Sequence, residues 1–331
     1  EEKPTGSISA GVGIGSSGSV VSTGINEDNL FGKGIKTYTN LSLGTEKISG
    51  NVSTTIPDFR NSDNDFIFDL YALATDYENV GYESTVVGSD ISTNYNILKD
   101  VYLKTGVGLN RDKITANDTA SALYKNRAGN YITYKAFYNI VSDKRDSRFQ
   151  PTEGYRLGFG QTLGMPGSDI SYLENSLFGT YYYPFDKDYI FNIKGGIKSI
   201  NSLENDDIKL SDRNFLSNRN LRGFENFAVG PKDGEEHIGG NYTAYSSLST
   251  TIPNPLPDTL NANTSIFLDF GNVWGVDFDN SKDSDKIRSS TGLSLDWISP
   301  IGPVSFVFSQ VLSSAEGDIK ESFNFQLGTS F

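Results

Sequence analysis

The sequence predicts an all-β fold, a transmembrane antiparallel up-and-down β-barrel of about sixteen strands with one long loop folded into its lumen. Three observations lead to this fold class. Hydrophobic residues make up only 36% of the 331 residues, and no apolar run is long enough for a transmembrane helix. Short segments alternate between apolar and polar residues along most of the chain. The connections between these segments include both tight turns and long polar stretches.

The period-two alternation is clearest in three segments. In each of them apolar or aromatic side chains take every second position, and small, polar or charged side chains take the others (residues 7–14, 131–140 and 189–198). Charged residues such as Lys135 and Lys194 opposite an aromatic face suit a wet lumen inside a lipid-facing wall. A soluble β-sandwich has the same alternation with its apolar face inside. Strand length, repetition and aromatic content favour the barrel.

The composition limits the partners and the chemistry. The chain has 18 Tyr and 21 Phe against 2 Trp, which suits aromatic belts at two membrane interfaces. Its net charge of -13 argues against nucleic acid as a partner, because phosphate binding needs a basic surface. The absence of Cys excludes thiolate metal sites and a Cys nucleophile. We expect no cofactor.

The connections differ in kind along the chain. Pro, Gly and Asp mark tight turns at residues 56–58, 183–186 and 299–303. Long polar segments occupy residues 111–130, 199–240 and 275–288. Short turns at one end and long loops at the other are typical of outer-membrane barrels. The segment 199–240 is too long for a bare connection, so we expect it to be functional or folded into the lumen.

The start of the chain bears on domain organisation. Residue 1 is Glu, and no signal peptide follows. An outer-membrane protein must be exported, which indicates a mature fragment or an excised domain. We expect residues 1–6 to be the stub of a linker and residues 7–331 to form the barrel.

Three features that could carry chemistry have simpler explanations. Residues 13–18 match G-x-G-x-x-G, but an alternating segment follows where a dinucleotide site needs a helix. His237 is the only His, and nothing pairs a specific Ser with it for hydrolysis. The acidic loop 277–285 lacks the Gly and the closing Glu of a calcium loop, although loose Ca²⁺ binding stays open. We therefore predict no catalytic residue and no metal site.

The most specific motif is Asn220-Leu221-Arg222-Gly223-Phe224, inside the longest segment. It resembles the V-R-G-F/Y signature of the BamA superfamily of outer-membrane assembly factors. Five further stretches resemble that family, in family order, at residues 26–34, 146–159, 229–241, 267–274 and 297–306. The resemblance spans nearly the whole chain. It implies that the longest segment is the family's sixth extracellular loop.

The resemblance also implies how this loop is held. In the family, the signature Arg reaches into the lumen and pairs with inward carboxylates on strands twelve and thirteen. Arg222, followed by Gly223 and Phe224, would be the loop anchor here. Asp269 matches the acid on strand thirteen, and alternation places it inward. The acid on strand twelve is missing, and Ser249 is expected in its place, so a single carboxylate would hold Arg222.

The two ends of the chain are expected to meet at a weak lateral seam. The last strand carries Phe323, Phe325, Leu327 and Phe331 on one face, which resembles the C-terminal β-signal that marks outer-membrane proteins for assembly. Gly weakens strand order and packing, so a Gly-rich first strand could part from the last at modest cost. The expected seam residues are Ser9, Gly11 and Gly13 on the first strand and Asn324, Gln326 and Gly328 on the last.

The resemblance implies a function without covalent chemistry: catalysis of the folding and insertion of β-barrel precursors into the cell outer membrane. The implied partners are unfolded precursors, outer-membrane lipid, and accessory lipoproteins bound mainly through periplasmic repeats that precede the barrel in the family. Two alternatives share the fold, a TamA-like autotransporter assembly factor and a passive or secretion pore. An outer-membrane hydrolase that depends on His237 would belong to a third class.

Overall fold

The computed structural model describes residues 5–328 except 78, 119, 149, 187, 205, 254–256, 258, 259, 300 and 301. The barrel strands are β1 (Gly6–Gly15), β2 (Gly18–Leu30), β3 (Ile35–Gly44), β4 (Lys47–Ile56), β5 (Asp65–Asp76), β6 (Tyr82–Leu98), β7 (Val101–Ala116), β8 (Gly129–Asp143), β9 (Gly154–Gly164), β10 (Tyr172–Asp186), β11 (Tyr189–Ser202), β14 (Tyr242–Ile252), β15 (Ala262–Trp274), β16 (Arg288–Ser299), β17 (Gly302–Ser313) and β18 (Phe323–Gly328). The short elements are η1 (Phe59–Asn61), α1 (Ala122–Arg127), η2 (Leu210–Asp212), β12 (Lys232–Asp233), β13 (Glu236–His237) and η4 (Asn280–Lys282).

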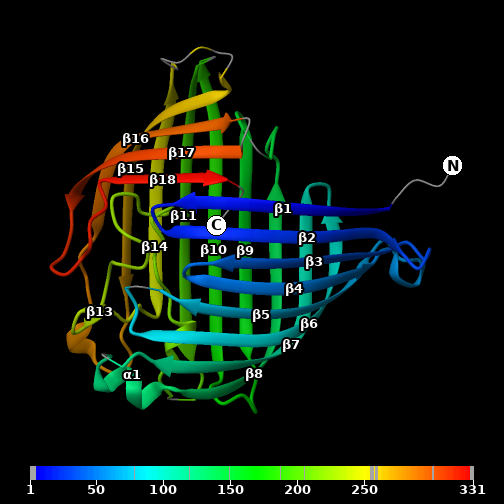
Figure 1. Cartoon of the computed structure of the whole chain (residues 1–331), viewed down its shortest axis with the longest axis horizontal. Helices are drawn as coiled ribbons and strands as arrows, with labels where there is room; N and C mark the ends of the chain where they lie inside the picture. The colour runs from blue at the N-terminus through cyan, green and yellow to red at the C-terminus, as the bar shows by residue number, and fades with distance from the viewer. Residues whose placement is uncertain are drawn as a thin grey trace.

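Across the described residues, sixteen antiparallel strands close into one barrel in which β1 meets β18 (Figure 1). Strands that are consecutive around the barrel are also consecutive in the chain. The exception is β11 beside β14, because β12 and β13 form a separate two-stranded hairpin. The predicted up-and-down barrel is therefore confirmed. β1 begins at Gly6, one residue before the predicted start of the barrel, and residues 1–4 of the predicted linker stub lie outside the described residues.

The outer wall carries the apolar side chains. On β8, Ile132 and Tyr134 are 42% and 43% exposed on the outside, whereas Thr133 between them is buried on the lumen side. On β11, Ile193 is exposed and Lys194 faces inward toward the long loop. This is the alternation that a lipid-facing wall around a polar interior requires, and it is the reverse of a soluble sandwich.

The described part of the chain contains no helix that is both long enough and apolar enough to span a membrane.

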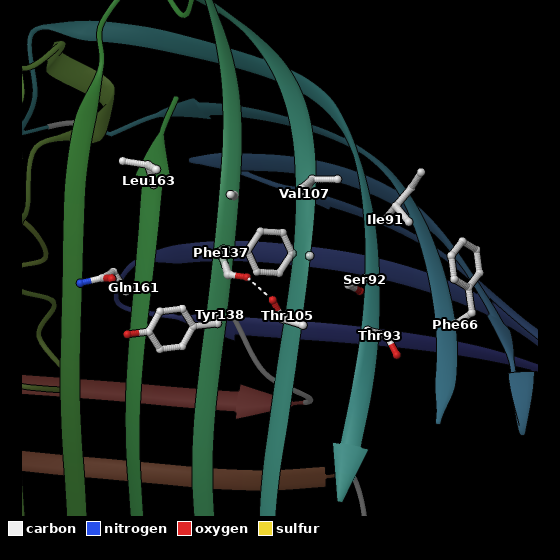
Figure 2. A pocket seen from close by; sticks show the side chains of 12 residues that line it. Phe66, Ile91, Ser92, Thr93, Thr105, Val107, Phe137, Tyr138, Gln161 and Leu163 are labelled. Carbon is white, nitrogen blue, oxygen red and sulfur yellow. Dashed lines mark hydrogen bonds between the residues drawn. The ribbon is translucent and has the colours of Figure 1, made fainter. Parts of the chain in front are cut away.

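One stretch of the wall, formed by β5 to β9, carries a groove of about 520 Å³ (Figure 2). Much of its lining is apolar, including Phe66, Ile91, Val107 and Leu163. Ile91 and Val107 are 44% and 51% exposed, so they belong to the outward face. Within the groove, the Thr105 hydroxyl donates a hydrogen bond of 3.1 Å to the carbonyl of Phe137, which satisfies its polar group in an apolar wall.

Two of the predicted connections are shorter than expected because the strands extend into them. The segment 183–186, predicted as a turn, is the end of β10, where the register shifts between Pro184 and Asp186. Residues 111–116, predicted as part of a long loop, continue β7 and pair with β6 and β8. A Pro at a strand end or bulge removes one backbone donor without ending the strand, so the turn signal was misleading here.

The longest connection, residues 203–241, packs inside the barrel rather than outside it. Its apolar side chains form two buried clusters with residues of the strands and the neighbouring loops. One cluster contains Leu210 and Ile238, and the other contains Leu221 and Phe224. The Tyr82 hydroxyl of β6 donates a 2.8 Å hydrogen bond to the carbonyl of Leu210, which links this segment to the barrel wall. The predicted folding of this loop into the lumen is confirmed.

Candidate functional site

Arg222 is held in the lumen by a bidentate ion pair with Asp269. Its Nε and Nη2 atoms donate to the two carboxylate oxygens of Asp269 at 2.7 Å each, and its backbone N–H donates to the same carboxylate at 3.1 Å. The guanidinium also lies 3.5 Å from the centroid of the Phe267 ring. The Asp269 side chain is only 1% exposed, and a buried carboxylate needs such a partner. The structure thus brings together the two charges that the sequence singled out.

The next two residues of the motif fix the loop against the wall. Gly223 has φ +92°, and a Cβ there would lie 3.0 Å from the Cβ of Ser290 and 3.3 Å from Cγ2 of Val311. Only glycine accepts both that backbone conformation and that close approach without strain. Phe224 is buried in the cluster that contains Leu221 and Val273. Arg222 therefore supplies the charge of the anchor, Gly223 the close approach and Phe224 the apolar contact.

The partner of Arg222 on β14, the twelfth strand of the barrel, is Ser247. The assignment of Ser249 to this position is therefore wrong. Arg222 Nη2 donates to Ser247 Oγ at 2.9 Å, and Ser247 lies directly opposite Asp269 in the sheet. Ser249 lies opposite Phe267 and donates to the side chain of Asn192 on β11 at 3.4 Å. The two serines share a strand face, and alternation fixes that face without fixing the position along the strand. Pairing with β15 decides between them.

We expect Ser247→Asp to tighten the anchor, because it gives the guanidinium a second carboxylate. The substitution replaces a hydrogen bond between the charged guanidinium and a neutral hydroxyl by an ion pair, which should add about 1 kcal/mol after the cost of burying the new charge beside Asp269. The measurement is the rate at which protease cuts the 203–241 loop in the folded barrel, which should fall. Ser249→Asp is the matched control and should not slow cleavage. Equal protection by both variants would contradict the placement of Ser247, rather than Ser249, beside Arg222.

Two charged groups of this region were missed by the sequence analysis. Lys194 Nζ on β11 donates to Asn220 Oδ1 at 2.8 Å and supports the loop next to the motif. Arg288 on β16 forms a second bidentate pair, with both bonds to Asp318 at 3.0 Å and both side chains buried. It ties the barrel wall to the loop between β17 and β18. Neither residue belongs to a sequence motif. Only its bonding partner in the structure identifies its role.

The seam is short. Among the described residues, β1 pairs with β18 at three positions, Gly13–Gly328, Ile14–Leu327 and Gly15–Gln326, whereas it pairs with β2 at ten. Figure 1 shows β18 lying beside β1. Gly328 has φ +104°, and a Cβ there would lie 2.1 Å from the carbonyl oxygen of Val12. Gly328 therefore lies directly against the backbone of β1, and only Gly tolerates that contact.

Among the described residues, only part of the expected seam is paired. Gly13, Gln326 and Gly328 lie in it as predicted. Ser9 and Gly11 do not face β18 among the described residues and pair only with β2, while Asn324 pairs with Val307 of β17. The expected set assumed that β18 runs along most of β1. As far as it is described, β18 pairs only with the last three residues of β1, and sequence periodicity does not reveal this stagger.

Three residues of the predicted β-signal, Phe323, Phe325 and Leu327, lie in β18. Phe323 is 44% exposed on the outer face of the barrel, and its ring centroid lies 5.0 Å from that of Phe308 and 6.2 Å from that of Phe325. Leu327 lies two residues after Phe325 in the same strand. Phe331 lies outside the described residues.

The structure also places the G-x-G-x-x-G match, His237 and the acidic loop 277–285. Residues 13–18 comprise the end of β1, a tight turn and the first residue of β2, so a strand follows where a dinucleotide site needs a helix. His237 is completely buried in β13, and burial, followed by the charge of Lys232, lowers its pKa to about 4. In the acidic loop, Asp277 forms an ion pair with Arg213, and Asp279 accepts a hydrogen bond from the backbone N–H of Ser281.

Comparisons with known proteins agree with this architecture. The family model described as the Omp85 superfamily domain matches residues 29–331. The chain is 28% identical to an outer membrane protein assembly factor BamA from Neorickettsia risticii, over 100% of this chain and 46% of that protein. It is 26% identical to BamA from Neisseria meningitidis serogroup B, over 100% of this chain and 47% of that protein. The chain thus spans about half the length of the curated relatives it matches.

A solved structure supports the same assignment. The crystal structure of BamA from Haemophilus ducreyi lacking POTRA domains 1-3 superposes with a TM-score of 0.93 and 25% identity. The match covers 100% of this chain and 71% of that one. Together with a family model that covers most of the barrel, this places the fold and the sequence in one group. The chain belongs to the Omp85 superfamily.

Proposed function

We propose that this chain is the barrel of an outer-membrane protein assembly factor that catalyses the folding and insertion of β-barrel precursors. The observation that carries the proposal is the seam, where β1 pairs with β18 at three positions and with β2 at ten. Residues 6–12 of β1 therefore have no β18 partner among the described residues. A strand edge of this kind can template the strand of another chain.

The physical problem in membrane insertion is the unpaired backbone. In the hydrocarbon of a bilayer each unsatisfied amide or carbonyl costs several kcal/mol, so a precursor strand cannot enter the bilayer unpaired. Pairing with the free edge of β1 would satisfy one side of an incoming strand while the next strand adds to the other. No covalent bond is made or broken in such a process. The low cost of parting a three-pair seam makes β1 the favoured edge.

The lumen loop favours an assembly factor over a passive pore. Residues 203–241 occupy the interior and are fixed there by Arg222, Asp269 and two apolar clusters. A general pore needs an open and permanent path. A loop held by a buried bidentate ion pair obstructs that path, and we therefore rank the pore and secretion functions second.

The proposed partners follow from the same role. Unfolded β-barrel precursors would bind at the seam, and outer-membrane lipid would contact the exposed apolar wall, which includes Ile132 and Ile193. Accessory lipoproteins would bind mainly through periplasmic repeats preceding the barrel. The proposed location is the outer membrane of a Gram-negative bacterium.

The test is reconstitution of the chain into vesicles of phospholipids in which β-barrels fold slowly on their own. A urea-unfolded barrel client should fold several-fold faster in these vesicles than in empty ones, as measured by the gel mobility of unheated samples. Vesicles that hold an equal amount of an unrelated closed barrel control for bilayer defects. Equal client folding rates in all three vesicle types, together with steady ionic conductance, would favour the passive pore.

A further inference from the structure

Three parts of the chain meet at the extracellular end of the seam. They are the β1–β2 turn at residues 15–18, the segment 314–322 that leads into β18, and the tip of the lumen loop at residues 217–219. The Ser16 backbone N–H donates to the carbonyl of Phe325 at 3.0 Å, and the Phe325 N–H donates to Ser16 Oγ at 3.1 Å. These bonds extend the seam beyond its three paired positions.

Glu321 stands at the centre of this junction. Asn324 of β18 donates to both of its carboxylate oxygens at 3.1 Å. The side chains of Ser16 and Asn218 lie close enough to Glu321 to lower its pKa. Burial raises the pKa of Glu321 above its ordinary value, and these contacts oppose that shift. One half-buried carboxylate therefore contacts the first hairpin, the last strand and the lumen loop at once.

The lumen loop makes two further contacts across the same junction. Asn218 Nδ2 donates to Ser17 Oγ at 3.3 Å, and Arg219 Nη2 approaches Gln326 Oε1 of β18 at 3.5 Å. The loop tip therefore reaches both edges of the seam. The backbone N–H of Glu321 also donates to the carbonyl of Gly223 at 3.0 Å, directly after the anchored Arg222.

A continuous set of contacts thus runs from the loop anchor to the seam. Asp269 holds Arg222, Gly223 accepts from the backbone of Glu321, and the carboxylate of Glu321 accepts from Asn324 of β18 and lies beside Ser16 of the first hairpin. Among the described residues, β1 and β18 share only three residue pairs. The side-chain contacts at this junction should therefore contribute to the stability of the seam on the same scale as its backbone hydrogen bonds.

We propose that Glu321 is the latch of the seam, a positioning residue that holds the extracellular end of β1 against β18 and couples the position of the lumen loop to seam opening. The latch leaves the remainder of the β1 edge free while keeping the barrel closed at its extracellular end. Its purpose, regulation of client access, rests on the proposed assembly function. The latch itself is a property of the barrel without any client.

The experiment measures the seam directly in the membrane-embedded barrel. Spin labels are placed at Val12→Cys on β1 and Leu312→Cys on β17, which are 61% and 57% exposed on the outer wall. In Glu321→Ala the ratio of barrels whose labels are far apart to barrels whose labels are close together should rise about tenfold. This rise corresponds to a loss of about 1.4 kcal/mol in the stability of the closed seam relative to the open one. Glu321→Gln, which keeps one acceptor oxygen, should restore most of the closed population. Glu316→Ala, an exposed acid in the same segment, is the matched control and should leave the ratio unchanged.

The coupling to the loop is tested by a double-mutant cycle. If the anchor acts through Glu321, Arg222→Ala should separate the labels in the wild-type background and add little in Glu321→Ala. Fully additive effects would overturn the coupling. A label distribution in Glu321→Ala identical to wild type, with the barrel folded by gel mobility, would overturn the latch. Separation of the labels without any change in client folding would leave the latch standing and contradict the assembly function proposed for the seam.

Discussion

A disulfide between Ile14→Cys and Leu327→Cys should stop client insertion while leaving the barrel folded. The two positions are direct neighbours across the seam, and neither is a glycine, so cysteines fit without backbone strain. Cross-strand neighbours lie within the ~7 Å between Cα atoms that a disulfide can bridge. The chain has no native Cys to interfere. Because templating requires β1 to part from β18, a covalent link should reduce the client folding rate to that of empty vesicles.

A second disulfide provides the control for this experiment. Val12→Cys and Val21→Cys join β1 to β2 at a paired position, and both side chains face outward. That link leaves the seam free, so insertion should proceed at the wild-type rate. Reductant should restore the seam-locked variant to the same rate. If the fully oxidised Ile14–Leu327 link left client insertion unchanged, templating at this seam would be excluded, and thinning of the bilayer around the barrel would become the favoured mechanism.

Arg222→Ala should release the lumen loop and lower assembly activity. Removing one partner of a buried ion pair costs ~3–5 kcal/mol, because it leaves an uncompensated charge, and water in the lumen would reduce this figure. Here the charge left behind is Asp269, whose side chain is 1% exposed. Protease should therefore cut the 203–241 loop faster, and client folding should slow. Asp269→Asn should act in the same direction, because the amide keeps the shape and loses the charge.

The matched control is Arg145→Ala. Arg145 also forms a bidentate pair, with Asp143 at 2.9 Å for each bond, but it lies in the β8–β9 connection and away from the lumen loop. Its removal should leave loop cleavage unchanged. The anchor hypothesis would be wrong if Arg222→Ala and Arg145→Ala had the same cleavage rate and the same client folding rate as the wild type.

Most of the fold could be predicted from the sequence because strand faces follow from local periodicity. The alternation in residues 131–140 and 189–198 placed Ile132, Tyr134 and Ile193 on the outer wall, where they are exposed. The length of the segment 199–240 indicated a loop packed in the lumen. The resemblance of the motif around Arg222 identified both charges of the anchor, which the structure pairs at 2.7 Å.

The errors at the loop anchor and at the seam have one cause, which is that periodicity does not specify register. Ser247 and Ser249 are equivalent by alternation, and only pairing with β15 places Ser247 beside Arg222. Ser9 and Gly11 share a strand face with Gly13, yet among the described residues only Gly13 of these three meets β18. A shift by two residues preserves every inward and outward position, so no local pattern distinguishes these cases.

The sequence by itself determined which side chains face lipid, which segment fills the lumen, and which Arg and Asp form the anchor, because these properties depend on local period, length and motif. The tertiary structure alone decided the three-pair seam, the choice of Ser247 and the position of Glu321. Those features depend on the stagger between strands and on contacts between residues hundreds of positions apart. The physical reason is that closing a barrel fixes its register through all strands together, and the first and last strands can only take the pairing that remains.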